Sequence, residues 1–171
     1  NKTVELALLE QSIRDDLNTI APRVMAVTDP LKVVITNYPE GKLELLGAPY
    51  WPKEIPNEGS RNIPFARELY IDREDFAEIP PPGFKRLMLG EEVRLRYAYV
   101  IRCDEVVKDA NGIITQLNCS YDADTLGQNP KRKVKGAIHW VSVRHALRAE
   151  MRLYDKLFSV VDPDEGDDHF T

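Results

Sequence analysis

The sequence predicts an all-β fold, an antiparallel β-barrel preceded by one α-helix. Many short β-rich runs alternate with turns rich in proline and glycine, and this alternation is typical of barrels and sandwiches. A helical apolar spacing opens the chain. The 171 residues suggest one domain, or one domain plus an appendage, and 43% hydrophobic with 30% charged residues indicate a folded protein with a sizeable core.

Residues 4–17 are predicted to form the helix. Leu6, Leu9, Ile13 and Leu17 follow the spacing of one apolar stripe. Pro22 should end the helix, because the residue before a proline disfavours the helical conformation.

Short strands are expected after Pro22, separated by turns, at residues 24–28, 32–37, 42–46 and 65–71. Residues 47–64 are rich in proline and glycine and are predicted to form a loop. Asp72 is expected to cap a short helix over residues 73–77. Four residues, 80–83, form a stiff turn.

The clearest predicted strand covers residues 92–105, where apolar and other side chains alternate. Arg94 and Arg96 would then share one face, about 7 Å apart. Asn111-Gly112 marks a turn, and residues 113–121 should return antiparallel. With a loop of residues 110–112, Cys103 would face Cys119 as a pair of free thiols in a reducing compartment.

The last third is less regular. Residues 122–133 are predicted as a polar loop, in which Asp122 and Asp124 are capping carboxylates, and residues 134–143 as a strand. Residues 147–158 fit both helical and strand spacing, with a slight preference for helix. The acidic tail from Asp162 is typical of a linker.

Charge is uneven along a chain whose net charge is −5. Residues 85–102 hold five basic and two acidic side chains, residues 128–152 hold seven and one, and residues 162–168 hold five acids and no base. A basic surface on an acidic protein is typical of selective RNA binding, and an ordinary salt-bridged surface remains the alternative. No apolar run is long enough to span a membrane, and no secretory signal is present.

Catalytic motifs are missing from the sequence. It has no phosphate-binding glycine loop and no G-x-S-x-G, and His139, His145 and His169 lack metal-ligand spacing. We therefore predict no catalytic residue and no metal site. Arginine side chains on a rigid sheet suit the edges of unpaired RNA bases, and the aromatic residues supply either stacking surfaces or barrel core.

Several runs of residues resemble the glutaminyl-tRNA synthetase family, in order along nearly the whole chain. They are residues 23–32, 59–61, 71–73 with 75–76, 85–87 and 90–96, 121–126, 133–136 with 138–141, and 152–158. The eukaryote-type glutamyl-tRNA synthetase shares the barrel region and is an alternative, as are a stand-alone RNA-binding barrel and a non-RNA interaction module.

This resemblance implies a fragment of a glutamine–tRNA ligase, in keeping with a first residue that is not Met. Residues 1–20 would be a connector helix from a catalytic half, 21–161 the anticodon-binding barrel, and 162–171 a linker toward a second barrel. ATP and Mg would act in the full-length enzyme, with no cofactor in this chain. The resemblance also makes residues 147–158 an extended strand, which we prefer to the helix.

The resemblance implies six tRNA-contacting positions: Asn18, Arg23, Lys85, Arg86, Arg94 and Arg96. The first two match positions near the middle and third anticodon bases, the next two match third-base and backbone contacts, and the last two match a pair near the first base. Gly83 departs from the family, some members of which carry a longer polar side chain there. The implied protein is a cytoplasmic monomer whose partners are glutamine tRNA and its own catalytic domain, with no membrane association.

Overall fold

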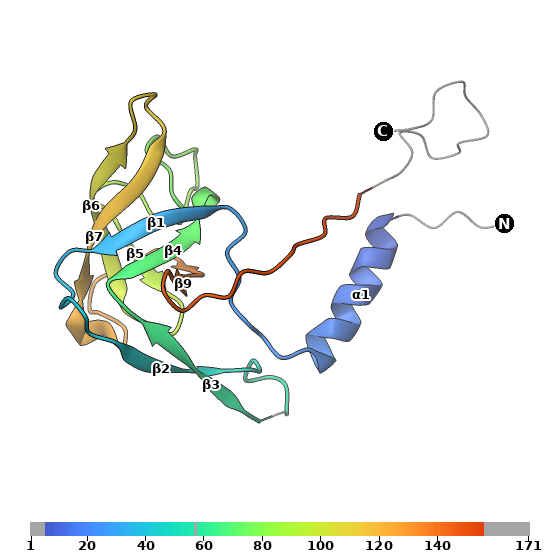
Figure 1. Ribbon diagram of the computed structural model, residues 1–171. Helices are drawn as coiled ribbons and strands as arrows, with labels where there is room; N and C mark the ends of the chain where they lie inside the picture. Colours follow the sequence, from blue (N-terminus) through green and yellow to red (C-terminus); the bar gives the residue numbers. More distant parts are fainter. Residues whose placement is uncertain (1–5, 57, 156–171) are drawn as a thin grey trace, which may run out of the picture. The chain divides into compact units, whose positions relative to one another are not determined.

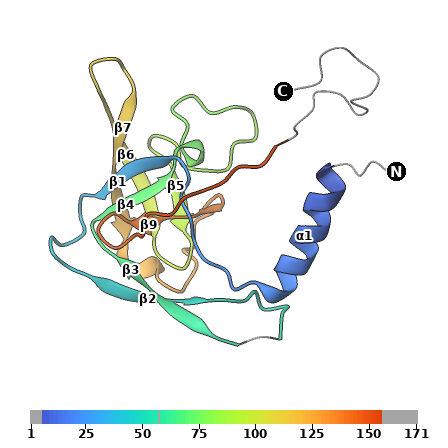
Figure 2. The ribbon, with the colours of Figure 1, turned by 45° about the vertical axis from the view of Figure 1, so that its right-hand side comes forward.

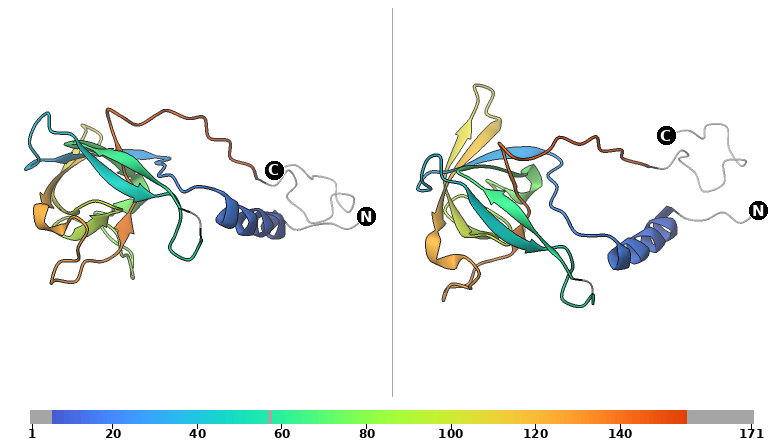
Figure 3. Two further views of the ribbon diagram at one scale, coloured as in Figure 1. Left: turned by 90° about the horizontal axis from the view of Figure 1, so that it is seen from below. Right: turned by 60° about the horizontal axis from the view of Figure 1, so that its bottom comes forward.

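A computed structural model of the protein describes residues 6–56 and 58–155. The chain divides into two compact units, one made of Asn1–Pro22 with Ala149–Thr171 and the other of Arg23–Arg148. All the strands found among the described residues belong to the second unit, which is shown from several sides in Figures 1, 2 and 3.

The first unit contains the helix α1, Leu6–Ile20, which confirms the predicted helix and extends it by three residues at its end. Val4, where the helix was predicted to begin, lies outside the described residues. The backbone N–H of Ala21 makes the last helical bond, to Leu17 at 2.9 Å, and Pro22 follows directly. The predicted terminator therefore acts where the sequence placed it.

Residues 147–155 adopt neither helix nor strand, so neither prediction for this part of residues 147–158 holds. Residues 156–158 and the acidic tail lie outside the described residues. Apolar residues in this segment fit both the helical and the strand spacing, so the spacing alone could not decide between helix and strand.

The second unit is built on a seven-stranded sheet with the order β8-β5-β6-β7-β1-β4-β9. These strands are β1 Pro30–Ile35, β4 Glu68–Asp72, β5 Glu92–Leu95, β6 Val100–Lys108, β7 Ile114–Asp122, β8 Ala137–Ile138 and β9 Val141–Ser142. Most neighbours are antiparallel, as predicted, but β1 pairs with β7, and β5 with β8, in parallel.

The sheet curls into a barrel-like shape whose two edge strands, β8 and β9, approach each other at a seam. These two strands lie at opposite ends of the strand order, yet His139 and Trp140 alone separate them in the sequence. Three Cα steps from Ile138 to Val141 span at most about 11 Å, so the end of β8 and the start of β9 lie close together. The curl is visible in Figure 2, and it confirms the predicted all-β barrel.

The barrel core is made of alternate residues from each strand, and Trp140 lies at its centre. In β1, for example, Leu31, Val33 and Ile35 are buried, whereas Lys32 is not. The Phe65 ring meets the Trp140 ring edge-on at 5.2 Å. An aromatic core of this kind fills a small barrel without a lumen.

The predicted strand over residues 92–105 is wrong, because it is two strands joined by a tight turn. β5 ends at Leu95 and β6 begins at Val100. Leu95 and Tyr99 are bridged by an N–H to carbonyl bond of 2.9 Å, and Tyr97 has a φ of 62°. A left-handed tyrosine is uncommon. Turns are usually marked in a sequence by glycine or proline, and this one contains neither, so the alternating pattern did not reveal it.

The predicted loop over residues 47–64 is also wrong at its two ends, residues 47–49 and 60–64, which are in strands. β2 Glu44–Pro49 pairs with β3 Ser60–Phe65 as an antiparallel two-stranded ribbon, which is drawn along one side of the barrel in Figure 3. Pro49 and Pro64 both lie in this ribbon. Both strands of an isolated ribbon are edge strands, which tolerate the missing N–H of proline.

Four smaller predictions also need correction. Residues 24–28 form no strand, and the predicted strand over residues 134–143 is the separate pair β8 and β9. The predicted strand over residues 65–71 contains the end of β3 and the start of β4. The helix expected after Asp72 is only the 3-10 turn η1, Arg73–Asp75, and Asp72 makes no side-chain cap to it.

The β6–β7 hairpin follows the sequence closely. Asp109 and Ile113 flank a turn of residues 110–112, with an N–H to carbonyl bond of 2.9 Å. Two irregularities in the β6–β7 pairing offset each other, so Cys103 faces Cys119 as predicted. Both cysteines are buried and free.

Asp72 ties the chain entering β1 to the end of β4. Its carboxylate accepts bonds from the Thr28 N–H at 2.8 Å, the Thr28 hydroxyl at 2.9 Å and the Asp29 N–H at 3.1 Å. Burial alone would raise the pKa of Asp72, but these bonds outweigh it, so the pKa lies below its ordinary value of 3.8.

Replacing Asp72 with alanine is expected to lower the free energy of unfolding at pH 7 by about 2 kcal/mol, because charge-assisted bonds are lost. A lowered pKa stabilises the fold above pH 3.8 and ceases to do so as the pH falls through the folded-state value. Urea unfolding between pH 2 and 7 should therefore show a shallower acid limb in the variant. An unchanged pH profile would contradict this role for Asp72.

Candidate functional site

The six predicted positions lie in both units. Asn18 is on α1 in the first unit, and the other five belong to the barrel unit. These five are Arg23, Lys85, Arg86, Arg94 and Arg96.

Arg23 is fixed through its backbone at the end of the β2–β3 ribbon where the loop of residues 50–59 joins the two strands. Its N–H donates to the Tyr50 carbonyl at 2.7 Å, and its own carbonyl accepts a bond from the Arg61 guanidinium. That guanidinium also lies over the Tyr50 ring, with 5.3 Å between its central carbon and the ring centre. Arg61 belongs to one of the family-like runs, and its contacts give that run a structural purpose.

Arg94 uses its guanidinium inside the protein. Nη1 donates to the carbonyls of Ala98 at 3.1 Å and Thr125 at 2.9 Å, and Nη2 donates to the carbonyl of Gln128 at 2.7 Å. The side chain thereby joins the turn after β5 to the segment that follows β7. Three of its donors are used in this way, so Arg94 acts chiefly as a structural clamp on the turn.

Arg96 lies in that turn rather than on a continuous strand, so the expected pairing with Arg94 on one strand face is wrong. Its backbone is held on both sides, because its N–H donates to the Ile138 carbonyl at 3.0 Å and its carbonyl accepts from the Trp140 indole at 2.9 Å. The side chain is exposed. Its guanidinium carbon lies 5.9 Å from the centre of the Tyr97 ring.

His139 adjoins Arg96 at the barrel seam. Burial lowers the pKa of His139, the positive charge of Arg96 lowers it further, and Asp72 opposes the change. The imidazole is therefore neutral at physiological pH. Arg96 thus carries the local positive charge next to an aromatic ring and a neutral histidine.

Lys85 and Arg86 are neighbours in the sequence but differ in their surroundings. Arg86 is held by carboxylates, with Nε 3.1 Å from Asp75 Oδ1 and Nη1 3.1 Å from Glu74 Oε1. Burial raises the pKa of Asp75, and Arg86 offsets part of that rise. The Lys85 side chain is exposed and has no hydrogen bond or ion pair within the described part of the chain.

A single backbone segment, residues 136–138, brings Lys85, Arg94 and Arg96 to one edge of the barrel. The Arg94 N–H points to the Gly136 carbonyl at 3.4 Å, and the Arg96 N–H bonds to Ile138. Gly136 also packs against the Lys85 carbonyl so closely that an added Cβ would lie inside van der Waals contact. This edge presents Arg96 and Lys85 as accessible donors.

Arg132 is a residue that the sequence did not single out. It donates to the Glu92 carboxylate from Nε at 2.7 Å and from Nη2 at 2.8 Å, and Nη2 also lies 2.6 Å from Asp122 Oδ2. The bond from Arg132 lowers the pKa of Asp122. Asp122 also accepts from the Asp124 N–H at 3.1 Å, which confirms the predicted capping turn.

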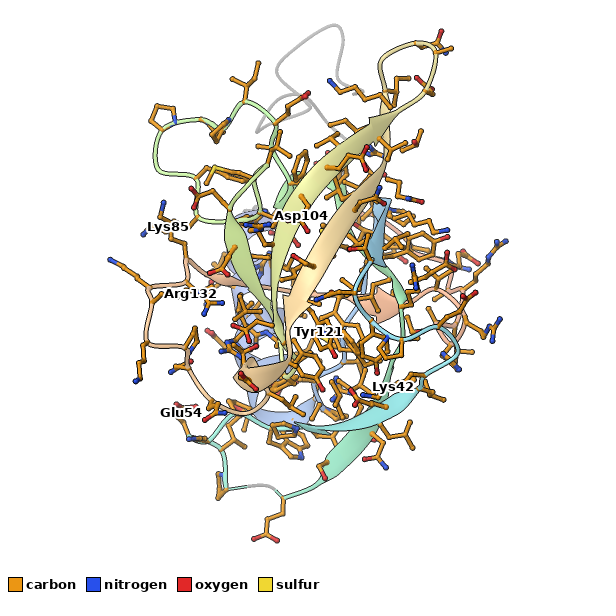
Figure 4. All side chains as sticks on the ribbon, turned by 90° about the vertical axis from the view of Figure 1, so that its left-hand side faces the viewer. Lys42, Glu54, Lys85, Asp104, Tyr121 and Arg132 are labelled. Carbon is orange, nitrogen blue, oxygen red and sulfur yellow. The ribbon has the colours of Figure 1, made fainter. Side chains whose placement is uncertain are left out.

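The run from Lys131 to Lys135 was visible in the sequence as a concentration of positive charge, and residues 133–136 also belong to a family-like run. Nothing in the pattern distinguished Arg132, which is held by two carboxylates, from its lysine neighbours. Figure 4 shows Lys85 and Arg132 on the same side of the barrel and Lys42 on the other side of the view. The edge that holds Lys85 therefore also carries this second basic segment.

The described residues contain no group of three or more histidine, cysteine or acidic side chains placed to hold a metal ion. Within the same residues, no helix has the length and apolar character needed to cross a membrane. What the barrel edge does offer is hydrogen-bond donors and positive charge from Arg96 and Lys85, which suit binding to an anion or to RNA bases.

The family described as tRNA synthetases class I (E and Q), anti-codon binding domain, matches residues 21–122, and a second family of the same description matches residues 137–171. A glutamine–tRNA ligase of Tolumonas auensis is 58% identical over 98% of this chain and 31% of its own length. Glutamine–tRNA ligases of Pseudomonas putida (58% identical, 96% and 29% covered) and Pectobacterium atrosepticum (56%, 98% and 31%) are similar. The chain spans about a third of the length of these curated relatives.

Proposed function

The chain belongs to the anticodon-binding domain family of the class I tRNA synthetases for glutamate and glutamine, and on that premise we propose that it binds the anticodon loop of glutamine tRNA. The observation that carries the proposal is the barrel edge on which Arg96 and Lys85 present unengaged donors. The relatives named above support glutamine over glutamate, because all three are called glutamine–tRNA ligases.

The chemistry of this edge fits a single-stranded RNA loop. Unpaired bases expose their pairing edges, and proteins read them with hydrogen bonds and stacking. Arg96 has a planar set of donors suited to a base edge, and its backbone is anchored to Ile138 and Trp140. An anchored backbone reduces the ordering cost of binding and sharpens the choice between bases.

Arg94 and Arg86 have a different part in this proposal. Their guanidinium groups are bonded to carbonyls and carboxylates, so a base that took either group would have to replace those partners. We assign both residues to positioning the surfaces that carry Arg96 and Lys85. Asn18 and Arg23 remain proposed contacts to the middle and third bases on the strength of the family resemblance.

The activity of the whole ligase is part of the same proposal. Attachment of glutamine to tRNA with ATP and Mg would take place in the portion of the relatives that this chain does not match. The chain itself would contribute tRNA selection. The glutamyl enzyme and a stand-alone RNA-binding barrel are less favoured, because the similar proteins are glutamine ligases about three times as long.

The test is direct binding of the chain to two RNA stem-loops that differ only in the anticodon, CUG for glutamine and CUC for glutamate. We expect tighter binding to the glutamine anticodon. Replacing Arg96 with alanine should weaken that binding by about 1–3 kcal/mol, the value of one good bidentate contact. Fluorescence anisotropy with labelled RNA measures both effects.

Lys32→Ala is the matched control, because Lys32 lies on β1 in an exposed ion pair with Glu68 at 2.6 Å. This variant should bind like the parent chain. Equal affinity of the parent chain for the two stem-loops would refute the proposed function. A normal affinity in the Arg96 variant would remove Arg96 from the reading surface.

A further inference from the structure

Residues 131–136, here called the lysine loop, carry three exposed lysines, Lys131, Lys133 and Lys135. None of the three forms a hydrogen bond or an ion pair within the described part of the chain. The neighbouring basic residues differ in this respect, since Arg132, Arg102 and Arg86 are each bonded to carboxylates. The lysine loop is therefore a source of positive charge that the described part of the chain does not neutralise.

The lysine loop is held to the barrel near both of its ends. Arg132 bonds to Glu92 on β5 and to Asp122 at the end of β7. At the other end, Gly136 packs against the Lys85 carbonyl and receives the Arg94 N–H. These contacts give the lysines a fixed place beside β5, although they lie outside regular structure.

A shallow hollow of about 290 Å³ lies next to the lysine loop. It is lined by Gly90, Glu91, Glu92, Arg102, Arg132, Lys133 and Lys135. Arg132 neutralises Glu92, and Arg102 is paired with Asp104, so Glu91 alone faces the two lysines with an uncompensated charge. With Lys131 and Lys85 close in the fold, the balance around the hollow is positive.

We propose that the lysine loop binds phosphate groups of the tRNA backbone next to the anticodon loop. This inference rests on the proposed function, because the RNA would be placed there by the edge that holds Lys85 and Arg96. Lysine is a flexible point charge without a planar set of donors, so it suits phosphates rather than base edges. The lysine loop would then add affinity that does not depend on base sequence.

The test compares the intact chain with a variant in which Lys131, Lys133 and Lys135 are all alanine. Both proteins are titrated with the CUG and CUC stem-loops at several salt concentrations. Each phosphate contact to a single strand contributes about 0.7 to the slope of log affinity against log salt, so the slope should decrease in magnitude by about 2. Affinity near 0.1 M salt should fall by about 10-fold or more, equally for both stem-loops.

A control variant with alanine at Lys32, Lys42 and Lys108 makes the same change in net charge. Each of these lysines is paired with a carboxylate, at 2.6, 2.5 and 2.7 Å, and such exposed pairs contribute little to stability. We expect its salt slope to remain within about 0.7 of that of the parent chain. A slope change as large as that of the lysine-loop variant would show a general charge effect and overturn the proposal.

The two proposals fail in different ways. If the parent chain does not distinguish the two stem-loops, the proposed function fails whatever the lysines do. If it distinguishes them but the lysine-loop variant keeps the parent slope, the phosphate site fails and the proposed function stands. A variant that loses the preference between stem-loops, rather than affinity for both, would also overturn the phosphate assignment, because it would place the lysines at the bases.

Discussion

Replacing Arg94 with alanine will lower the free energy of unfolding by about 3–5 kcal/mol. The guanidinium bonds to the carbonyls of Ala98, Thr125 and Gln128, and each charge-assisted bond contributes on the order of 1.5–3 kcal/mol with incomplete additivity. Without it the left-handed Tyr97 turn loses its clamp, and Arg96 loses its fixed position. Urea unfolding followed by tryptophan fluorescence measures the loss.

Two controls separate the clamp from the loss of a charge. Arg102→Ala removes an arginine from the adjacent strand, where the guanidinium makes a half-exposed pair with Asp104, and should cost no more than about 1 kcal/mol. Arg94→Lys keeps the charge but cannot reach three carbonyls with a planar fork, so it should recover only part of the loss. An Arg94→Ala variant as stable as the Arg102 variant would contradict the clamp.

Replacing Gly136 with alanine is expected to cost about 3 kcal/mol and to weaken RNA binding. Gly136 has a φ of 75°, in the left-handed region that costs other residues about 1–2 kcal/mol. Its new Cβ would also meet the Lys85 carbonyl, and that backbone atom would have to move. Both unfolding in urea and stem-loop affinity should respond, because Lys85 is part of the proposed surface.

Gly41→Ala is the matched control for this prediction. Gly41 has a similar φ of 72°, but no other atom lies within 4 Å of an added Cβ. It should therefore show the backbone cost alone, about 1–2 kcal/mol, with unchanged RNA affinity. Equal losses in the two variants would mean that the Lys85 contact has no energetic weight.

The parts of the fold that sequence could predict are those governed by local periodicity. The short β-rich run predicted as a strand at residues 32–37 overlaps β1, and the turn at Asn111-Gly112 led directly to the observed hairpin. The turn at Tyr97 could not be predicted, because its stability comes from Arg94 bonding to carbonyls more than thirty residues away. A similar reason applies to the division of residues 137–142 into β8 and β9, because these strands pair with different partners, β5 and β4, that are distant in the sequence.

The candidate site shows the same division between local and long-range information. Composition alone located the two basic segments, and residue type indicated donors suited to RNA. Which donors are accessible depends on tertiary contacts. Asp75 engages Arg86 and leaves Lys85 exposed, and neither outcome has a signal in the run that contains both basic residues.

The seam at Trp140 has a consequence for the order in which the barrel is assembled during synthesis. The edges of β5 and β4 are covered by β8 and β9, which are the last strands of the barrel to leave the ribosome. Until residues 137–142 emerge, a nascent chain would expose both edges to other chains, and uncovered edges promote aggregation. Chains truncated shortly before Ala137 should therefore be insoluble, whereas chains that include residues 137–142 cover both edges and should stay soluble.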